Sequence, residues 1–152
     1  MTADNTDAAL SEGLVTVIES GTGTYTQRIT AGRHQLFADE PVPIGDDAGP
    51  TPYDLLLAGL GACTSMTVRM YADQHGWPLT GIRVRLSHDK VHAKDCAECE
   101  SKGTRVDRLQ RSVKLVGPLT EEQRAKLTAM ADRCPVHRTL ESEVEVLTEL
   151  EE

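Results

Sequence analysis

The chain of 152 residues carries 24 Asp and Glu against 16 Lys and Arg, which gives a formal net charge of −8, and only 3% of its residues are aromatic. A chain of this length can bury the core of a single domain without disulfide or metal staples. The acidic balance argues against nucleic acid or an anionic membrane as a partner, and the scarcity of aromatic rings argues against a stacking platform for bases.

Residues 1–12 are polar and acidic and lack the basic and apolar regions of a signal peptide. They are predicted to form a disordered or loosely held tail, followed by a single domain over residues 13–152. The sequence contains no run of about 18 apolar residues. We therefore expect a cytoplasmic protein whose four cysteines are reduced at rest, which favours redox, catalytic or metal roles over a disulfide framework.

The first third of the chain predicts antiparallel strands. The segment LVTVIES at residues 14–20 alternates apolar and polar side chains, and the following GTG turns the chain. TYTQRITA and HQLFADEP predict a hairpin around Ala31 and Gly32. The proline-rich stretch PVPIGDDAGPTP excludes helix and central strand, so it is expected to be a loop.

A long helix is predicted from about Tyr53 to about His75, where the sequence GWP supplies a glycine cap and a proline stop. Its first half, Leu55–Cys63, is apolar on every side and is expected to be enclosed all round. Gly59 and Gly61 weaken a helix, so they predict close packing of another element on its backbone. A second subunit is a natural candidate for that element.

Two strands with one apolar face each are predicted in the second half of the chain. TGIRVRLSH and DRLQRSVKLVG both alternate apolar and polar residues. The residues expected to face inward are Ile82, Val84 and Leu86 on the first strand and Leu109, Val113 and Leu115 on the second. The polar segment between them, DKVHAKDCAECESKGTR, is expected to connect two strands of one meander.

A second helix is predicted to begin after Thr120, which forms a capping-box pattern with Gln123. Its apolar spacing is expected to bury Leu127, Met130, Ala131 and Cys134. Cys134 is therefore expected on the inner face at the C-terminal end of this helix, with Pro135 ending it. TLESEVEVLTEL is expected to close the chain as a strand with Leu140, Val144 and Val146 facing inward.

Cys63 and Cys134 are each predicted on the buried face of a core helix, so packing of the two helices can make the thiols adjacent. The plainer alternative is that both are small core hydrophobes. The charged residues of DRCPVHRTLE weaken that alternative for Cys134, since a plain core position does not need them. Burial disfavours a thiolate, so a reactive Cys63 requires an arginine from elsewhere in the fold. A helix C-terminus also disfavours a thiolate, which makes Cys63 the better nucleophile and Cys134 the better resolving thiol.

Two stretches carry a resemblance to a known family: GPTPYDLLLAGLGACTSMTVRMYA around Cys63 and ADRCPVHRTLESEVEV around Cys134. With the element order over residues 13–149, they resemble the OsmC/Ohr family of thiol peroxidases, and most of all its uncharacterised OsmC-like branch. The resemblance implies an α+β fold in which antiparallel sheets wrap around two long central helices in an intertwined homodimer. It implies reduction of organic hydroperoxides by a Cys63 and Cys134 redox pair, in oxidative or osmotic stress defence. A lipoylated or other dithiol protein is the implied reductant.

One feature of the characterised family members is missing from this chain. In those members a glutamate near the start of the first helix orients an arginine towards the reactive thiol, whereas this chain has Tyr53 ten residues before Cys63. Glu40 is the candidate for the missing carboxylate, and Arg28 or Arg33 for the guanidinium. The alternative for each is a solvated surface charge.

A second cluster consists of His88, His92, Cys96 and Cys99, a set able to form a tetrahedral zinc site. Its two ligand pairs lie closer together in sequence than is usual for structural zinc, so zinc is not favoured and no resident cofactor is expected. A redox-active vicinal pair and ordinary loop thiols are the alternatives for the two cysteines. For the whole protein, the rival to a peroxidase is a non-catalytic dimeric module that binds an apolar ligand between its helices.

Overall fold

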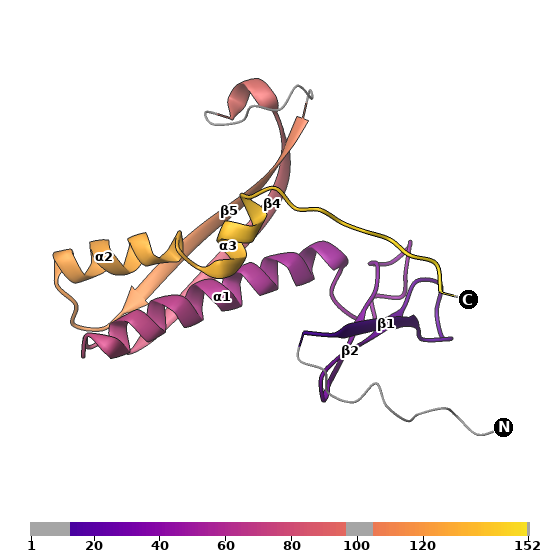
Figure 1. The fold of residues 1–152 in the computed structure, drawn as a ribbon, viewed down its shortest axis with the longest axis horizontal. Helices are drawn as coiled ribbons and strands as arrows, with labels where there is room; N and C mark the ends of the chain where they lie inside the picture. The colour runs from indigo at the N-terminus through magenta and orange to yellow at the C-terminus, as the bar shows by residue number, and fades with distance from the viewer. Residues whose placement is uncertain (1–12, 97–104, 152) are drawn as a thin grey trace. The chain divides into compact units, whose positions relative to one another are not determined.

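The structure is a computed structural model that describes residues 13–96 and 105–151. They form two compact units, one ending at Leu55 and the other beginning at Leu56. The elements, in chain order, are β1 (Val15–Glu19), β2 (Gln27–Ala31), β3 (His34–Ala38), α1 (Pro52–Gln74), β4 (Gly81–His92), the short 3₁₀ helix η1 (Ala93–Asp95), β5 (Arg105–Val116), α2 (Glu121–Ala131) and α3 (Pro135–Leu140) (Figure 1). The α+β class is confirmed, and the predicted tail at 1–12 lies outside the described residues.

The first unit contains an antiparallel sheet in the order β1-β2-β3. Ile29 on the central strand lies opposite Val17 on β1 and Leu36 on β3, so branched and apolar side chains share one register across the sheet. Gly32, at φ +57°, makes the turn between β2 and β3, a left-handed conformation that favours glycine. The hairpin predicted around Ala31 and Gly32 is confirmed.

The proline-rich loop after β3 is held by one buried carboxylate. Asp39 is only 2% exposed, and its oxygens accept hydrogen bonds from the Thr26 hydroxyl at 2.9 Å and the backbone N–H groups of Glu40 at 2.8 Å and Ala48 at 3.2 Å. Burial raises the pKa of Asp39, but these hydrogen bonds outweigh that effect and the pKa lies below its usual value. The loop therefore has a defined path to the first helix, although it has no regular secondary structure.

The long helix α1 agrees with its predicted bounds. At its start, Thr51 and Asp54 form a reciprocal cap: the Thr51 hydroxyl accepts from the Asp54 N–H at 3.2 Å, and the Asp54 carboxylate accepts from the Thr51 N–H at 3.0 Å. Gly76, at φ +62°, follows the C-terminal end, as the glycine cap predicted.

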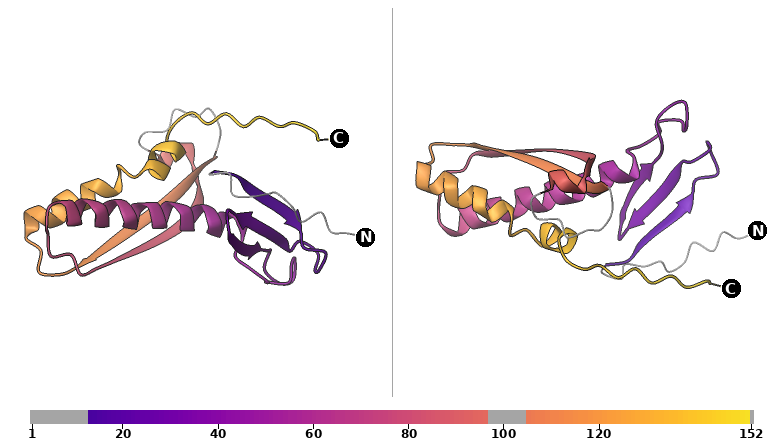
Figure 2. Two further views of the ribbon diagram at one scale, coloured as in Figure 1. Left: turned by 60° about the horizontal axis from the view of Figure 1, so that its bottom comes forward. Right: turned by 90° about the horizontal axis from the view of Figure 1, so that it is seen from above.

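The second unit is built on a hairpin of two twelve-residue strands, in which Gly81 pairs with Val116 and His92 with Arg105. Figures 1 and 2 show α1 and α2 running along this β4–β5 hairpin. Buried residues of the two helices form the core with Leu79, and inward-facing strand residues pack against them. The core residues are Val68, Ala72, Leu79, Leu127 and Ala131, with Ile82, Val113 and Leu115 partly buried beside them. The predicted inner faces of both strands are confirmed.

Within this chain α1 is buried on one face only, which differs from the expectation that its first half is enclosed all round. Leu60 is 4% exposed, whereas Leu56 is 51% and Met66 68% exposed. The close packing predicted at the two glycines holds for one of them: a Cβ on Gly61 would lie 2.7 Å from Leu86 of β4, whereas a Cβ on Gly59 meets nothing within 4 Å in the described chain.

By length and composition alone, α1 is also able to cross a membrane, with a mean hydropathy of 1.2 over its best 18 residues. The core helix of a soluble protein meets the same criterion. Here α1 contributes Val68 and Ala72 to a core shared with α2, and it carries Arg69 and Asp73. These features agree with a core helix.

The end of the chain differs from its prediction. Pro135 does not simply end the second helix; it is the first residue of a short helix, α3, a position in which proline is favoured because its missing N–H would be unpaired there anyway. The predicted closing strand is wrong for this chain: residues 143–151 have no regular structure, with Val144 60% and Val146 83% exposed. An alternating pattern forms a strand only when a neighbouring strand supplies hydrogen-bond partners.

Candidate functional site

The second unit brings the two predicted thiols together. Cys63 lies on α1 and is half-buried, Cys134 lies between α2 and α3 and is 0% exposed, and both are free thiols. The Cys63 side chain forms a hydrogen bond with the Cys134 sulfur. The two thiols are therefore adjacent, which the sequence allowed but did not establish. Cys63 is the accessible thiol of the pair.

Cys134 does not lie at a helix C-terminus, as the sequence pattern predicted. The second helix ends at Ala131 and is capped by Asp132, and Cys134 is instead the N-cap of α3. Its sulfur accepts a hydrogen bond from the backbone N–H of His137 at 3.3 Å. The electrostatic consequence is the reverse of the expected one, because the N–H groups at the start of a helix favour a negative charge.

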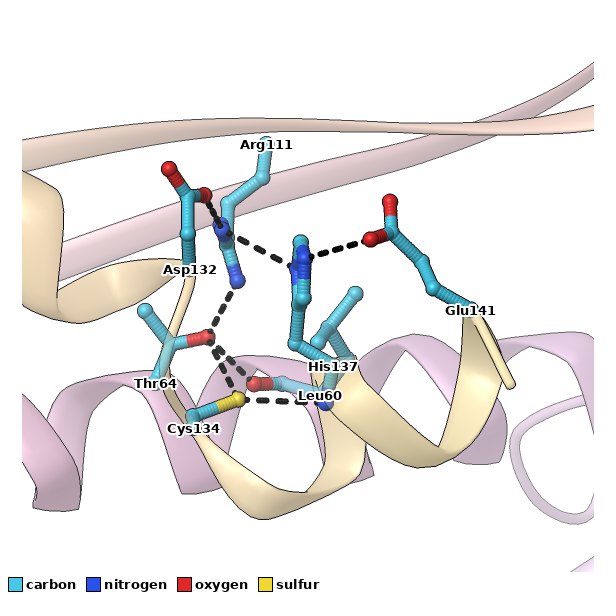
Figure 3. Close-up of polar contacts among 7 residues, drawn as sticks. All are labelled: Leu60, Thr64, Arg111, Asp132, Cys134, His137 and Glu141. Atoms are coloured by element: carbon cyan, nitrogen blue, oxygen red, sulfur yellow. Dashed lines mark hydrogen bonds and ion pairs between the residues drawn. The ribbon is translucent and has the colours of Figure 1, made fainter. Parts of the chain in front are cut away.

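The threonine that follows Cys63 lies against the buried thiol. Thr64 is 0% exposed, and its hydroxyl lies 3.8 Å from the Cys134 sulfur. The same hydroxyl donates to the carbonyl of Leu60 at 2.7 Å and accepts a hydrogen bond from the Arg111 guanidinium at 2.9 Å. Thr64 therefore connects an arginine on β5 to the sulfur of Cys134 (Figure 3).

Arg111 extends from β5 into this cluster and is held by three neighbours. Besides its bond to Thr64, Nη2 donates to the Asp132 carboxylate at 2.7 Å and lies 3.4 Å from Nδ1 of His137. A guanidinium has no acceptor, so Nδ1 must accept and Nε2 carries the ring proton. That Nε2 lies 3.1 Å from the Glu141 carboxylate (Figure 3). A series of polar contacts thus leads to the sulfur of Cys134, through Glu141, His137, Arg111 and Thr64.

These contacts lower the pKa of the Cys134 thiol. Burial raises its pKa, but the hydrogen bond from the His137 N–H, the hydrogen-bond contacts with the Thr64 hydroxyl and the Cys63 thiol, and the charge of Arg111 outweigh burial and hold the pKa below the ordinary thiol value. Because the thiolate is the nucleophilic form of cysteine, these contacts favour the reactive form of Cys134.

A cavity of about 370 Å³ opens beside this cluster. Leu60, Leu109 and Leu140 supply its apolar wall, and Arg111 and Glu141 belong to its polar wall. It is large enough for a small organic molecule. The cluster therefore combines a reactive pair of thiols, an arginine and adjoining space.

The other predicted site residues lie in the first unit. Arg28 is an exposed residue of β2, paired with Ile18 and Phe37, and Glu40 is a partly exposed residue that follows β3. Tyr53, at the family's glutamate position, is 48% exposed near the start of α1. Their roles in activating Cys63 stay predictions.

The structure describes three of the four residues of the second predicted cluster, namely His88, His92 and Cys96. His88 bonds the Asp107 carboxylate at 2.7 Å, and Cys99 lies outside the described residues. Cys96 is disulfide-bonded, so the expectation that all four cysteines are reduced is wrong for this residue. Over residues 13–96 and 105–151, no group of three or more His, Cys, Asp or Glu side chains is placed to hold a metal ion.

Sequence reasoning missed Arg111 and Thr64. A signal for Arg111 was present: it has the same strand parity as the inward-facing Leu109 and Val113, and a charge on an apolar face marks a functional or paired position. Its side chain is 11% exposed, as that parity predicts. Thr64 gave no such signal, because threonine is unremarkable inside a helix.

Comparison with known proteins gives a family and a fold. A family profile described as OsmC-like protein matches residues 45–149. An OsmC-like protein from Mycoplasma pneumoniae is 18% identical, with a TM-score of 0.64, over 83% of this chain and 84% of its own. No curated protein sequence matches this chain significantly.

Two further solved structures carry functional names. An organic hydroperoxide resistance protein OsmC from Legionella pneumophila is 18% identical, with a TM-score of 0.61, over 88% of this chain and 91% of its own. An organic hydroperoxide resistance protein from Vibrio cholerae, with captopril bound in one of its active sites, is 16% identical, with a TM-score of 0.57, over 87% of each chain. At these identities the likeness establishes the fold alone.

Proposed function

Since this chain belongs to the OsmC-like protein family, whose profile covers most of it, we propose that it is a thiol-dependent peroxidase that reduces organic hydroperoxides through Cys63 and Cys134. One observation carries the proposal: the two free thiols are in contact, with Cys63 accessible and Cys134 buried. The names of the Legionella and Vibrio proteins support the same substrate class.

The proposed reaction has two steps at the protein. An electron pair of the Cys63 sulfur attacks a peroxide oxygen, the O–O bond breaks, and the alkoxide leaves and is protonated to the alcohol. Cys63 is then a sulfenic acid. The Cys134 thiolate attacks its sulfur, a disulfide forms, and the displaced hydroxide takes up a proton and leaves as water. Contact between the two sulfurs favours this second step over further oxidation.

Turnover requires an external reductant. A dithiol protein reduces the Cys63 and Cys134 disulfide by thiol exchange and is itself oxidised, so one hydroperoxide and one dithiol give one alcohol, one water and one disulfide. A lipoylated protein is the proposed donor, and oxidative or osmotic stress defence in the cytoplasm is the proposed setting. Proteins of this family are generally soluble, which agrees with α1 being a core helix.

The proposal predicts a specific product from a single equivalent of oxidant. Reduced protein mixed with one equivalent of cumene hydroperoxide is expected to form a disulfide between Cys63 and Cys134 and to release one equivalent of cumyl alcohol. Mass spectrometry of non-reduced peptides and chromatography measure the two products. Thiols that stay reduced while the peroxide persists would instead support a ligand-binding module with structural cysteines.

The exposed face of α1 predicts a homodimer. Leu56, Met66 and Met70 are 51%, 68% and 60% exposed and recur along one side of the helix, and Gly59 lies between them with open space above it. We expect light scattering to show a dimer at micromolar concentration. Met66→Glu is expected to weaken association, because it places a charge in this face. Gln74→Glu, at the exposed end of the helix, is the matched control. A folded wild-type monomer would refute the dimer.

A further inference from the structure

Arg111 occupies an unusual position for an arginine. It projects from β5 at a register position shared with the apolar Leu109 and Val113, and only 11% of its side chain is exposed. Placing a guanidinium there carries a desolvation cost that an apolar residue would avoid. Asp132 balances the charge at one nitrogen, but that carboxylate is 70% exposed, so the pair is only partly buried. The other terminal nitrogen is directed at Thr64.

Thr64 is suited to transmit the charge of Arg111. A hydroxyl has one hydrogen and two lone pairs. With Arg111 donating to one lone pair, the hydrogen remains available either to the Leu60 carbonyl at 2.7 Å or, after rotation of the hydroxyl, to the Cys134 sulfur at 3.8 Å. The Leu60 carbonyl belongs to α1 and also accepts the helical N–H of Thr64, so this rotation leaves it paired.

We propose that Thr64 and Arg111 are positioning residues that hold Cys134 as the thiolate of the pair, with Arg111 acting through the Thr64 hydroxyl. This inference rests on the proposed function for its role in turnover, but the contacts that carry it do not depend on peroxide. Donation by Arg111 polarises the Thr64 hydroxyl, and a polarised hydroxyl donates a stronger hydrogen bond to a sulfur anion.

Charged groups on several elements around Cys134 affect the stability of its thiolate. The ionisable groups in contact with the cluster are Cys63 on α1, Arg111 on β5, Asp132 after α2, His137 on α3 and Glu141 after it. Asp107 on β5, which is bonded to His88 on β4, lines the adjoining cavity, and Arg133 and Arg138 are exposed residues beside Cys134 and His137 in the sequence. Arg111 is the cation that reaches the sulfur through a buried hydroxyl. Asp132 bonds the same guanidinium and opposes its effect on the sulfur.

A thiolate at Cys134 has a consequence for the attacking thiol. The Cys134 anion accepts the proton of Cys63 as the Cys63 sulfur forms its bond to the peroxide oxygen. The O–O bond breaks with its electron pair on the alkoxide, and the proton then passes from Cys134 to that alkoxide. Cys134 is again a thiolate, ready to attack the Cys63 sulfenic acid. No external acid or base is consumed before water is formed.

The first test measures the titration of Cys134 without any peroxide. In full-length protein labelled with ¹³C at cysteine Cβ, the Cys134 chemical shift is followed against pH. Thr64→Val keeps the side-chain shape but removes the hydroxyl, and it is expected to raise the Cys134 titration midpoint by about one pH unit or more. Thr64→Ser keeps the hydroxyl and is expected to hold the midpoint near that of the wild type. Equal midpoints in the Val and Ser variants would overturn the proposal.

The second test asks whether Arg111 acts through Thr64. Arg111→Met is expected to raise the midpoint, and the double variant with Thr64→Val is expected to add little to either single change. Asp132→Asn removes the opposing charge but keeps an acceptor, so it is expected to lower the midpoint. A purely structural role would not move the midpoint in opposite directions in these variants. Additive shifts from Arg111 and Thr64 would contradict the relay.

These measurements separate the inference from the proposed function. If Cys134 titrates as expected but hydroperoxide is not consumed, the relay stands and the peroxidase proposal fails. If hydroperoxide is consumed but Thr64→Val leaves the midpoint unchanged, the peroxidase proposal stands and the relay fails. Amide spectra of each variant establish that the fold around Cys134 is retained.

Discussion

Cys63→Ser is expected to abolish organic hydroperoxide consumption, with a loss of at least about 1,000-fold in rate. Serine is nearly the same size as cysteine, so the half-buried position on α1 should accept it without rearrangement. Its hydroxyl remains protonated at neutral pH and is a far weaker nucleophile than a thiolate. The measurement is peroxide consumption in the presence of a dithiol reductant, followed over many turnovers.

Two controls test whether the loss of activity comes from the Cys63 thiol itself. Circular dichroism and light scattering should show the same fold and the same assembly as the wild type. Ser65→Ala changes another side chain of α1 and is expected to keep consumption at the wild-type rate. Full activity in Cys63→Ser would end the peroxidase proposal.

Cys134→Ser is expected to consume one equivalent of peroxide and then stop. Without the second thiol, the sulfenic acid on Cys63 has no partner in the site with which to condense, so it accumulates. Serine at position 134 also removes the anion that accepts the Cys63 proton, so this single turnover should be slower than in the wild type. A dimedone adduct on Cys63, measured by mass spectrometry after one equivalent of peroxide, checks the prediction. Continued turnover in this variant would exclude Cys134 as the resolving thiol.

The order of the two thiols now rests on exposure. The sequence argument placed Cys134 at a helix C-terminus, where a thiolate is disfavoured, but its position as N-cap of α3 removes that argument. Cys134 is the thiol with the lowered pKa, yet it is 0% exposed, whereas Cys63 is half-buried and within reach of a peroxide. A dimedone adduct on Cys134 in the Cys63→Ser protein would show that the roles are reversed.

Local patterns in the sequence determined most of the elements. Alternation predicted β4 and β5 with their inward faces, and the Thr120 and Gln123 capping box is present with both hydrogen bonds at the start of α2. Gly32 and Gly76 both adopt positive φ where a turn and a helix end were predicted. Such features depend on a few neighbouring residues, so they can be inferred without knowledge of the fold. The sequence also determined that Cys63 and Cys134 are the thiols of interest.

Tertiary structure decided what those thiols can do. Pro135 begins a helix in the structure, and the Cys134 that caps this helix packs against Thr64, 70 residues earlier in the chain. Arg111 reaches the site because β5 packs beside α1, a contact that no local pattern specifies. The pKa of a buried thiol depends on desolvation and on a few directed hydrogen bonds within about 4 Å, so a sequence can name the reactive atom, but its charge follows only from the neighbours that folding brings to it.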